Sequence, residues 1–381
     1  MRKRIALISI AGVAFIASHA SAAQSSGLCA AAVKAVPIAT ECRETAGGVV
    51  IGKNAADVEA VARAAAEGER KFQAFFNRPV PRYAVSFFVG NDTVSKALRA
   101  ADFGVVQPWF DPEAKSAAMD QSVRRAVLKA AEGKNLDTAQ IEAMVAQAKA
   151  KMPQVSAATA AATDAGAVAH ELGHQWFIKS FSTGQAVGNL GHYGGPAPDW
   201  LDELAAVLHE NDELTANRRL QFEEIYRQLP DRKALPDTTR DDLIDLQKYL
   251  SREHPANKSV REALSKIRQA NGGKQKSGGM TILAGAEALA VSRDGLIFYL
   301  QSRAFADFMI ERSGSPHIFA EIAAADANGV TFPRWLAESG RTYKLVGTVP
   351  LLEKQWQTWL KAKYVTDRKT SVKIPSRSLV D

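Results

Sequence analysis

The chain has 381 residues, of which 46% are hydrophobic and 23% charged, a composition that excludes an intrinsically disordered protein. It carries 48 basic and 41 acidic residues, and loss of Arg2, Lys3 and Arg4 on processing leaves 45 − 41 = +4. So small an excess, without clustered Lys and Arg interleaved with aromatics, argues against nucleic acid as a partner.

The first 22 residues have the organisation of a secretory signal peptide. A basic MRKR start precedes the apolar run IALISIAGVAFIA, and Ala20, Ser21 and Ala22 form an A-x-A cleavage signal. The apolar run is too short to span a bilayer comfortably, which argues against the alternative of a membrane anchor. We therefore expect an exported protein, periplasmic or secreted, with no stable membrane insertion after cleavage.

Both cysteines of the chain, Cys29 and Cys42, lie in the N-terminal segment 23–45. Export to an oxidising compartment favours a disulfide between them over the alternative of two free thiols. We expect this bond to close a short loop at the edge of the fold.

Residues 46–160 are expected to form a subdomain that contains a small sheet. Three segments have the β-branched and aromatic enrichment of strands, namely 47–53, 81–90 and 104–110. Residues 55–76 read as an amphipathic helix. Pro108 suits only an edge strand, because it cannot donate to a ladder. Residues 112–151 are predicted to form a helical pair inserted after the sheet, interrupted at EGKN.

Residues 161–365 are predicted to form a mostly helical subdomain. Loops are expected at 183–198, 231–238 and 271–279, and 366–381 lacks apolar periodicity, as in a flexible tail. The predicted fold class is therefore α+β, with a small mixed sheet followed by helices.

The stretch AGAVAHELGHQWF, residues 165–177, contains the candidate chemistry. On a helix, His170 and His174 project from nearly the same face and can bind one Zn²⁺. Glu171 can then act as general base toward a zinc-bound water. The alternative is a solvent-facing helix with two incidental histidines.

A third zinc ligand is expected from PDWLDELAAVLHE, residues 198–210. Glu203 lies one turn inside this predicted helix and would complete a His₂Glu site with an open fourth position. Asp202 points about 100° away from it around the helix. Glu210 is the alternative on the same face, where it could instead hydrogen-bond a ligand histidine. His192 lies in a glycine-rich loop and fits a cleft-lining or solvated residue better than a ligand.

HELGHQW followed by PDWLDELAA resembles the gluzincin metallopeptidases, the superfamily of aminopeptidase N and thermolysin. Trp200, Leu201, Glu203 and Ala206 match the W-L-x-E-G-x-A-like segment of that family, whereas Leu204 replaces its glycine. Two downstream stretches are similar to helices of peptidase MA-like proteins, FYLQSRAFADFMIERSG at 298–314 and LLEKQWQTWLKAKY at 351–364.

The resemblance implies a thermolysin-like zincin architecture. It implies that His170, His174 and Glu203 bind zinc and that Glu171 is the general base. Tyr299 matches the tyrosine that, in the aminopeptidase branch, donates a hydrogen bond to the oxyanion, a charge present only in the transition state. The alternative for Tyr299 is a core aromatic residue on an amphipathic helix.

We therefore expect an exported zinc metallopeptidase with a peptide or protein substrate. Two alternatives stay open at this stage. One is an envelope-associated binding or assembly module with a structural zinc site, and the other is a zinc amidase that acts on cell-wall material. The oligomeric state, the side-chain preference and the choice between endo- and exo-cleavage are also open.

Overall fold

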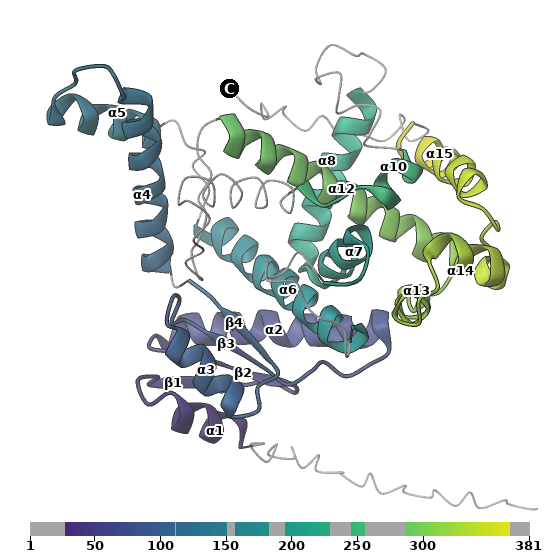
Figure 1. The fold of residues 1–381 in the computed structure, drawn as a ribbon, viewed down its shortest axis with the longest axis horizontal. Coiled ribbons are helices and arrows are strands. Elements are labelled where there is room, and N and C mark those ends of the chain that lie inside the picture. The colour runs from purple at the N-terminus through teal and green to yellow at the C-terminus, as the bar shows by residue number, and fades with distance from the viewer. Residues whose placement is uncertain are drawn as a thin grey trace, which may run out of the picture.

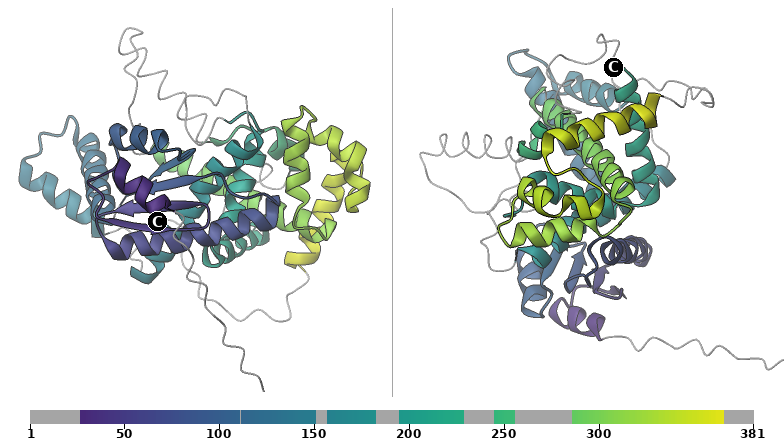
Figure 2. Two further views of the ribbon diagram at one scale, coloured as in Figure 1. Left: turned by 90° about the horizontal axis from the view of Figure 1, so that it is seen from below. Right: turned by 90° about the vertical axis from the view of Figure 1, so that its right-hand side faces the viewer.

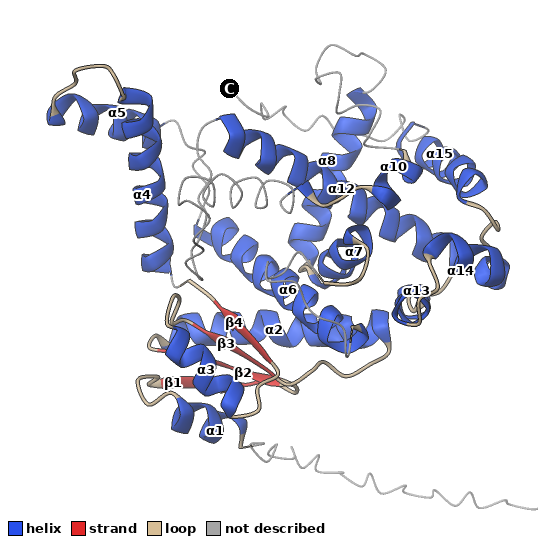
Figure 3. Ribbon diagram, viewed as in Figure 1, coloured by secondary structure: helices blue, strands red, loops and turns tan. Residues whose placement is uncertain are grey.

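The computed structural model describes residues 27–110, 112–150, 157–182, 195–228, 245–255 and 286–365. The predicted signal peptide, the tail 366–381, the loops at 231–238 and 271–279 and most of the loop at 183–198 lie outside these residues. In the described part, a small sheet with helices on both faces is followed by a larger group of helices (Figure 1; Figure 3). The fold is thus broadly α+β, as predicted.

The sheet has four strands in the order β1-β2-β3-β4, of which the first pair is antiparallel and the other two pairs are parallel. Their bounds are Glu41–Glu44, Gly48–Gly52, Tyr83–Ser86 and Val105–Pro108. The last three fall inside the predicted strand segments, whereas β1 was not predicted. Strand β4 lies at an edge of the sheet, and Pro108 is its last residue, which agrees with the expected edge position.

Alternate residues of the strands face two different cores, as the period of two in a strand requires. Val50 and Val85 face helix α2, Ala55–Phe76, in the larger core. Val49 and Ile51 face the smaller core on the opposite side. There they pack against two short helices that were not predicted, α1 (Leu28–Ala35) and α3 (Asp92–Ala100).

Helix α2 has the predicted bounds because residues at both ends stop it. The Asn54 side chain accepts hydrogen bonds from the backbone N–H groups of Ala56 and Asp57, a typical N-cap. Asn77 follows the helix with φ 50°, the left-handed conformation that asparagine tolerates at a C-terminus.

The predicted disulfide between Cys29 and Cys42 is present and links α1 to β1. The backbone N–H of Cys29 also donates to the Glu44 carboxylate at 2.7 Å. The N-terminal helix is therefore attached to the edge strand β1 at two points.

The predicted helical pair consists of α4, Pro112–Ala131, and α5, Thr138–Ala150. It projects from one end of the molecule, opposite the C-terminal helices (Figures 1 and 2). Val127 and Val145 are buried between the two helices. A Lys115–Asp164 ion pair connects α4 with the helix that carries HELGH.

The remaining helices pack around one another and share the larger core with the sheet. They are α6 (Ala157–Phe181), α7 (Asp199–His209), α8 (Asp212–Gln228), α10 (Leu246–Ser251), α12 (Ala286–Ser313), α13 (Ile318–Ala327), α14 (Phe332–Ser339), the 3₁₀ helix η2 (Gly340–Tyr343) and α15 (Val349–Val365). The boundary between subdomains that we expected at residue 160 stays a prediction. Among the described residues, the helices are too short or too polar for any of them to span a bilayer.

His209, the last residue of α7, is a fully buried histidine among aromatic rings. Phe72 and Phe76 of α2 stack on it, with ring centroids 5.3 and 5.8 Å away, and Trp176 of α6 meets it edge-on at 5.9 Å. Burial lowers the pKa of His209 to about 3, although a hydrogen bond with the Ala205 backbone opposes this change. The neighbouring cationic groups, Lys71 and the two motif histidines, lower the pKa further.

We predict that His209→Leu reduces the sensitivity of the protein to acid. Above pH 6.5 this histidine is neutral in both states and contributes no pH dependence. At lower pH, down to about pH 3, the unfolded chain binds a proton here that the folded protein excludes. The wild-type free energy of unfolding should therefore lose about 1.4 kcal/mol per pH unit at this residue as the pH falls.

Urea unfolding of both proteins, at several pH values between neutral and about 4, measures this difference in slope. The exposed His317 offers a matched control, since His317→Leu should follow the wild type. Equal slopes for His209→Leu and the wild type would contradict the prediction.

Candidate metal centre

Helices α6 and α7 bring the three predicted metal ligands together. His170 and His174 lie one turn apart on α6, and Glu203 faces them from α7. One ligand atom from each of the three residues lies within 4.8 Å of the other two. Glu203 Oε1 is 3.5 Å from His170 Nε2, and Glu203 Oε2 is 3.6 Å from His174 Nε2. This group of buried donors can hold a metal ion.

The close approach of α6 and α7 depends on glycine between the two histidines. A Cβ atom at Gly173 would come within 2.6 Å of His209 Nδ1 and within 3.1 Å of the Ala206 Cα atom. Any larger residue would push the helices apart. The small residues of the HELGH stretch and of the facing helix therefore set the distance across which the ligands meet.

Each histidine is held from behind by a carboxylate. His170 Nδ1 is 2.9 Å from Glu210 Oε1, and His174 Nδ1 is 3.0 Å from Asp202 Oδ1. Such hydrogen bonds fix the ring orientation and leave Nε2 of each imidazole for a metal. The contact of Glu210 with His170 is the hydrogen bond suggested for it in the sequence, whereas that of Asp202 with His174 was not predicted.

Arg218 of α8 neutralises the buried carboxylate of Glu210. Its guanidinium forms a bidentate pair with both Glu210 oxygens. Burial alone would raise the pKa of Glu210, but the hydrogen bonds from His170 and Arg218 hold it below its ordinary value. Glu210 therefore stays ionised and can accept the Nδ1–H of His170.

The Glu203 carboxylate has a different environment, because it is completely buried and accepts no hydrogen bond within the described residues. Burial raises its pKa to about 7. For His174, burial would lower the pKa, but the charge and hydrogen bond of Asp202 raise it to about 9. Burial thus acts on both groups, and the neighbouring Asp202 decides the direction of the shift at His174.

Glu171 and Tyr299 lie beside the three candidate ligands. Glu171 is half-buried on α6, and its charge contributes to the raised pKa of His174. Tyr299 of α12 is also half-buried, with its ring 5.5 Å from that of His170. The Arg218 guanidinium lies over the Tyr299 ring, 5.0 Å from its centroid. Tyr299 thus lies beside the metal group and is not enclosed in the core.

Two further residues at the centre were missed in the sequence. His254 is buried, with Nε2 3.4 Å from Glu203 Oε2, and Arg218 reaches the centre through Glu210. Neither lies in a recognisable motif, and each arrives from a segment outside the HELGH and WLDELAA stretches, so no spacing rule could identify them. His192 lies outside the described residues.

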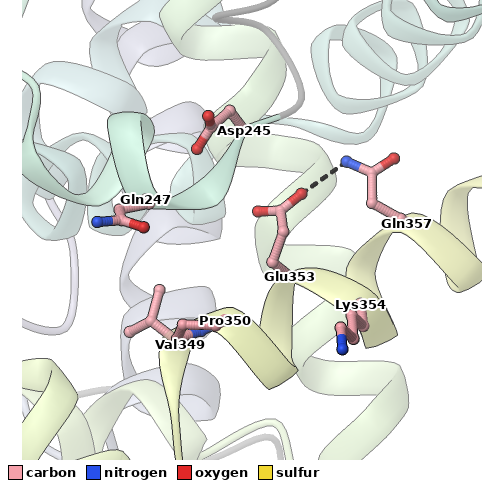
Figure 4. Close-up of a pocket in the computed structure, with 7 residues that line it drawn as sticks. All are labelled: Asp245, Gln247, Val349, Pro350, Glu353, Lys354 and Gln357. Carbon is pink, nitrogen blue, oxygen red and sulfur yellow. Dashed lines mark hydrogen bonds between the residues drawn. The ribbon is translucent and has the colours of Figure 1, made fainter.

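A separate pocket of about 420 Å³ lies between α10 and α15 (Figure 4). It shares no residue with the group of His170, His174 and Glu203. Its Glu353 carboxylate already accepts hydrogen bonds from Gln357 Nε2 and from the Leu246 N–H, both at 2.6 Å. Asp245, at the pocket rim, caps α10 by accepting from the Lys248 N–H. The polar groups in this pocket therefore serve to join and cap helices.

Comparisons with protein-family models, with curated proteins and with solved structures gave no match.

We predict that Arg218→Met strongly destabilises the protein. Among the described residues, the substitution leaves the buried Glu210 carboxylate with His170 as its hydrogen-bond partner, and breaking a buried ion pair in this way costs about 3–5 kcal/mol. The double variant Arg218→Met with Glu210→Gln should recover part of that loss, because a neutral amide can still accept from His170. Chemical denaturation of the metal-free proteins measures both values.

Arg334→Met is the control, since its ion pair with Glu338 is exposed on α14. It should leave the unfolding free energy nearly unchanged. If Arg218→Met were as stable as this control, the buried pair would not stabilise the centre.

Proposed function

We propose that the chain is an exported zinc-dependent peptidase. In this proposal His170, His174 and Glu203 hold the metal ion, and Glu171 is the general base. The observation that carries the proposal is the buried group of two imidazoles and one carboxylate, supported from behind by Asp202 and Glu210. Two histidines and one glutamate are a donor set of catalytic zinc sites, which keep one position open for water or substrate.

The donor atoms fit a divalent cation. The Glu203 oxygens are buried without a hydrogen bond from the described residues, and a metal ion would satisfy them. The three buried carboxylates of Asp202, Glu203 and Glu210 face the single guanidinium of Arg218, so negative charge remains in excess when the imidazoles are neutral. A doubly charged cation would offset this excess. When bound, zinc would lower the pKa of a water molecule and polarise the scissile carbonyl.

The side chains around the metal group supply the other chemical roles. Glu171 lies beside the ligands on the same helix, so its carboxylate can accept a proton from the attacking water and pass it to the leaving amine. Tyr299, whose ring packs against His170, can donate its hydroxyl hydrogen to the developing oxyanion.

An extended peptide is the substrate that best suits the sheet. β4 is an edge strand of the described sheet and packs against α6, which carries the histidines. On the side away from β3 it has no strand neighbour in the described sheet, so its backbone could pair there with a peptide and align it with the candidate ligands. Export follows from the signal-like N-terminus and completes the proposal.

We predict that the purified mature chain binds one zinc ion and hydrolyses members of a peptide library. Glu171→Gln should keep the zinc but lose activity by about 10²–10⁴-fold, because the general base is removed. His170→Ala should lose the zinc as well. Elemental analysis and mass-spectrometric substrate profiling measure both properties.

Glu213→Gln, at an exposed position on α8, is the matched control and should behave as the wild type. Absence of stoichiometric zinc in the wild type, or wild-type activity in Glu171→Gln, would refute the proposal. Cleavage of muropeptides in place of peptides would favour the amidase alternative. Bound zinc without any hydrolysis would favour the binding module.

A further inference from the structure

His254 belongs to a short segment that follows α10 and is attached to α7. Its backbone N–H donates to Asp199 Oδ2 at 2.7 Å, and Asp199 is the first residue of α7. The segment is therefore anchored to the helix that carries Glu203, four residues further along. Any displacement of one would be transmitted to the other.

The side chain of His254 is held in one orientation by α12. It is 1% exposed, and its ring meets Phe298 edge-on at 5.0 Å and lies 5.6 Å from Tyr299, measured between ring centroids. The Nε2 atom lies 3.4 Å from Glu203 Oε2. The packing of the ring thus directs a potential donor at the carboxylate.

His254 contacts the carboxylate without joining the ligand group. The residues whose ligand atoms all lie within 4.8 Å of one another are His170, His174 and Glu203. The two oxygens of Glu203 have different neighbours, because Oε1 faces His170, whereas Oε2 faces both His174 and His254. A hydrogen bond to Oε2 would leave Oε1 as the oxygen better placed to bind metal.

We propose that His254 is a positioning residue for the metal: when the ion binds, the Nε2–H of His254, whose nitrogen lies 3.4 Å from Glu203 Oε2, donates to that oxygen and holds the carboxylate so that Oε1 is presented to the ion. This inference rests on the proposed function, because it assumes that Glu203 is a ligand. Carboxylate ligands are themselves commonly hydrogen-bonded, and the loss of such an outer partner weakens metal binding by about 10–100-fold.

The test compares His254→Leu with His254→Gln in the purified mature chain. Leucine fills the space without a donor, whereas the glutamine amide can replace the Nε2–H. We expect the zinc dissociation constant, measured by competition with a chromogenic chelator, to rise about 10–100-fold in His254→Leu and to stay within about threefold of wild type in His254→Gln. The visible absorption spectrum of the Co²⁺-loaded protein should change in His254→Leu alone.

Tyr249→Phe is a control from the same region of the chain. It removes a buried hydroxyl that hydrogen-bonds to Ser302 Oγ at 2.8 Å and to the Trp200 carbonyl oxygen at 3.4 Å, and neither of these contacts is to Glu203. It should bind zinc as the wild type does. Thermal unfolding of the metal-free variants shows whether a substitution has disturbed the fold itself.

Two results would overturn the inference while leaving the proposed function intact. One is a wild-type zinc affinity in His254→Leu, and the other is a His254→Gln variant, folded as the wild type, that binds zinc as weakly as His254→Leu. The first would show that the contact has no effect on the metal, and the second that the ring acts by packing alone. If the wild type bound no zinc, the proposed function would fail and this inference with it.

Discussion

The packing of α6 directly against α7 is the constraint on which the metal group depends. It places the Glu203 carboxylate, which is completely buried, opposite two imidazoles. A buried carboxylate costs several kcal/mol unless it is paired or hydrogen-bonded. The surrounding charges follow from this burial, because each buried charge needs a partner of its own: Asp202 lies behind His174, and Arg218 pairs with the Glu210 carboxylate behind His170.

The local part of this arrangement was predictable from the sequence. The spacing of four between the histidines places both on one face of a helix, and Glu203 follows a helix-opening Pro198–Asp199 pair. Helix α2 and strands β2 to β4 were likewise indicated by hydrophobic periodicity, by enrichment in strand-forming residues and by turn residues. These signals come from neighbours in the chain and need no knowledge of the tertiary structure.

The unpredicted parts depend on contacts between distant segments. Asp202 was expected to point away from the metal, yet a histidine has a second nitrogen on the far side of its ring, and that is the atom Asp202 reaches. Strand β1, with the sequence ECRE, has no apolar pattern and forms because β2 pairs with it and Cys42 is bonded to α1. His254 contributes through a single contact that no spacing in the sequence encodes.

Tyr299 shows how these distant contacts act together. Its ring packs against His170, which is a candidate ligand, and against His254, which is proposed to orient Glu203. It also lies under the guanidinium of Arg218, the residue that pairs with Glu210. Its ring is therefore held by the same side chains that surround the group of His170, His174 and Glu203. A donor that stabilises a transition state must be fixed before the charge develops. In this fold, His170, His254 and Arg218 would provide that fixed position for Tyr299. Binding of the metal and placement of the Tyr299 hydroxyl would then depend on one connected set of side chains.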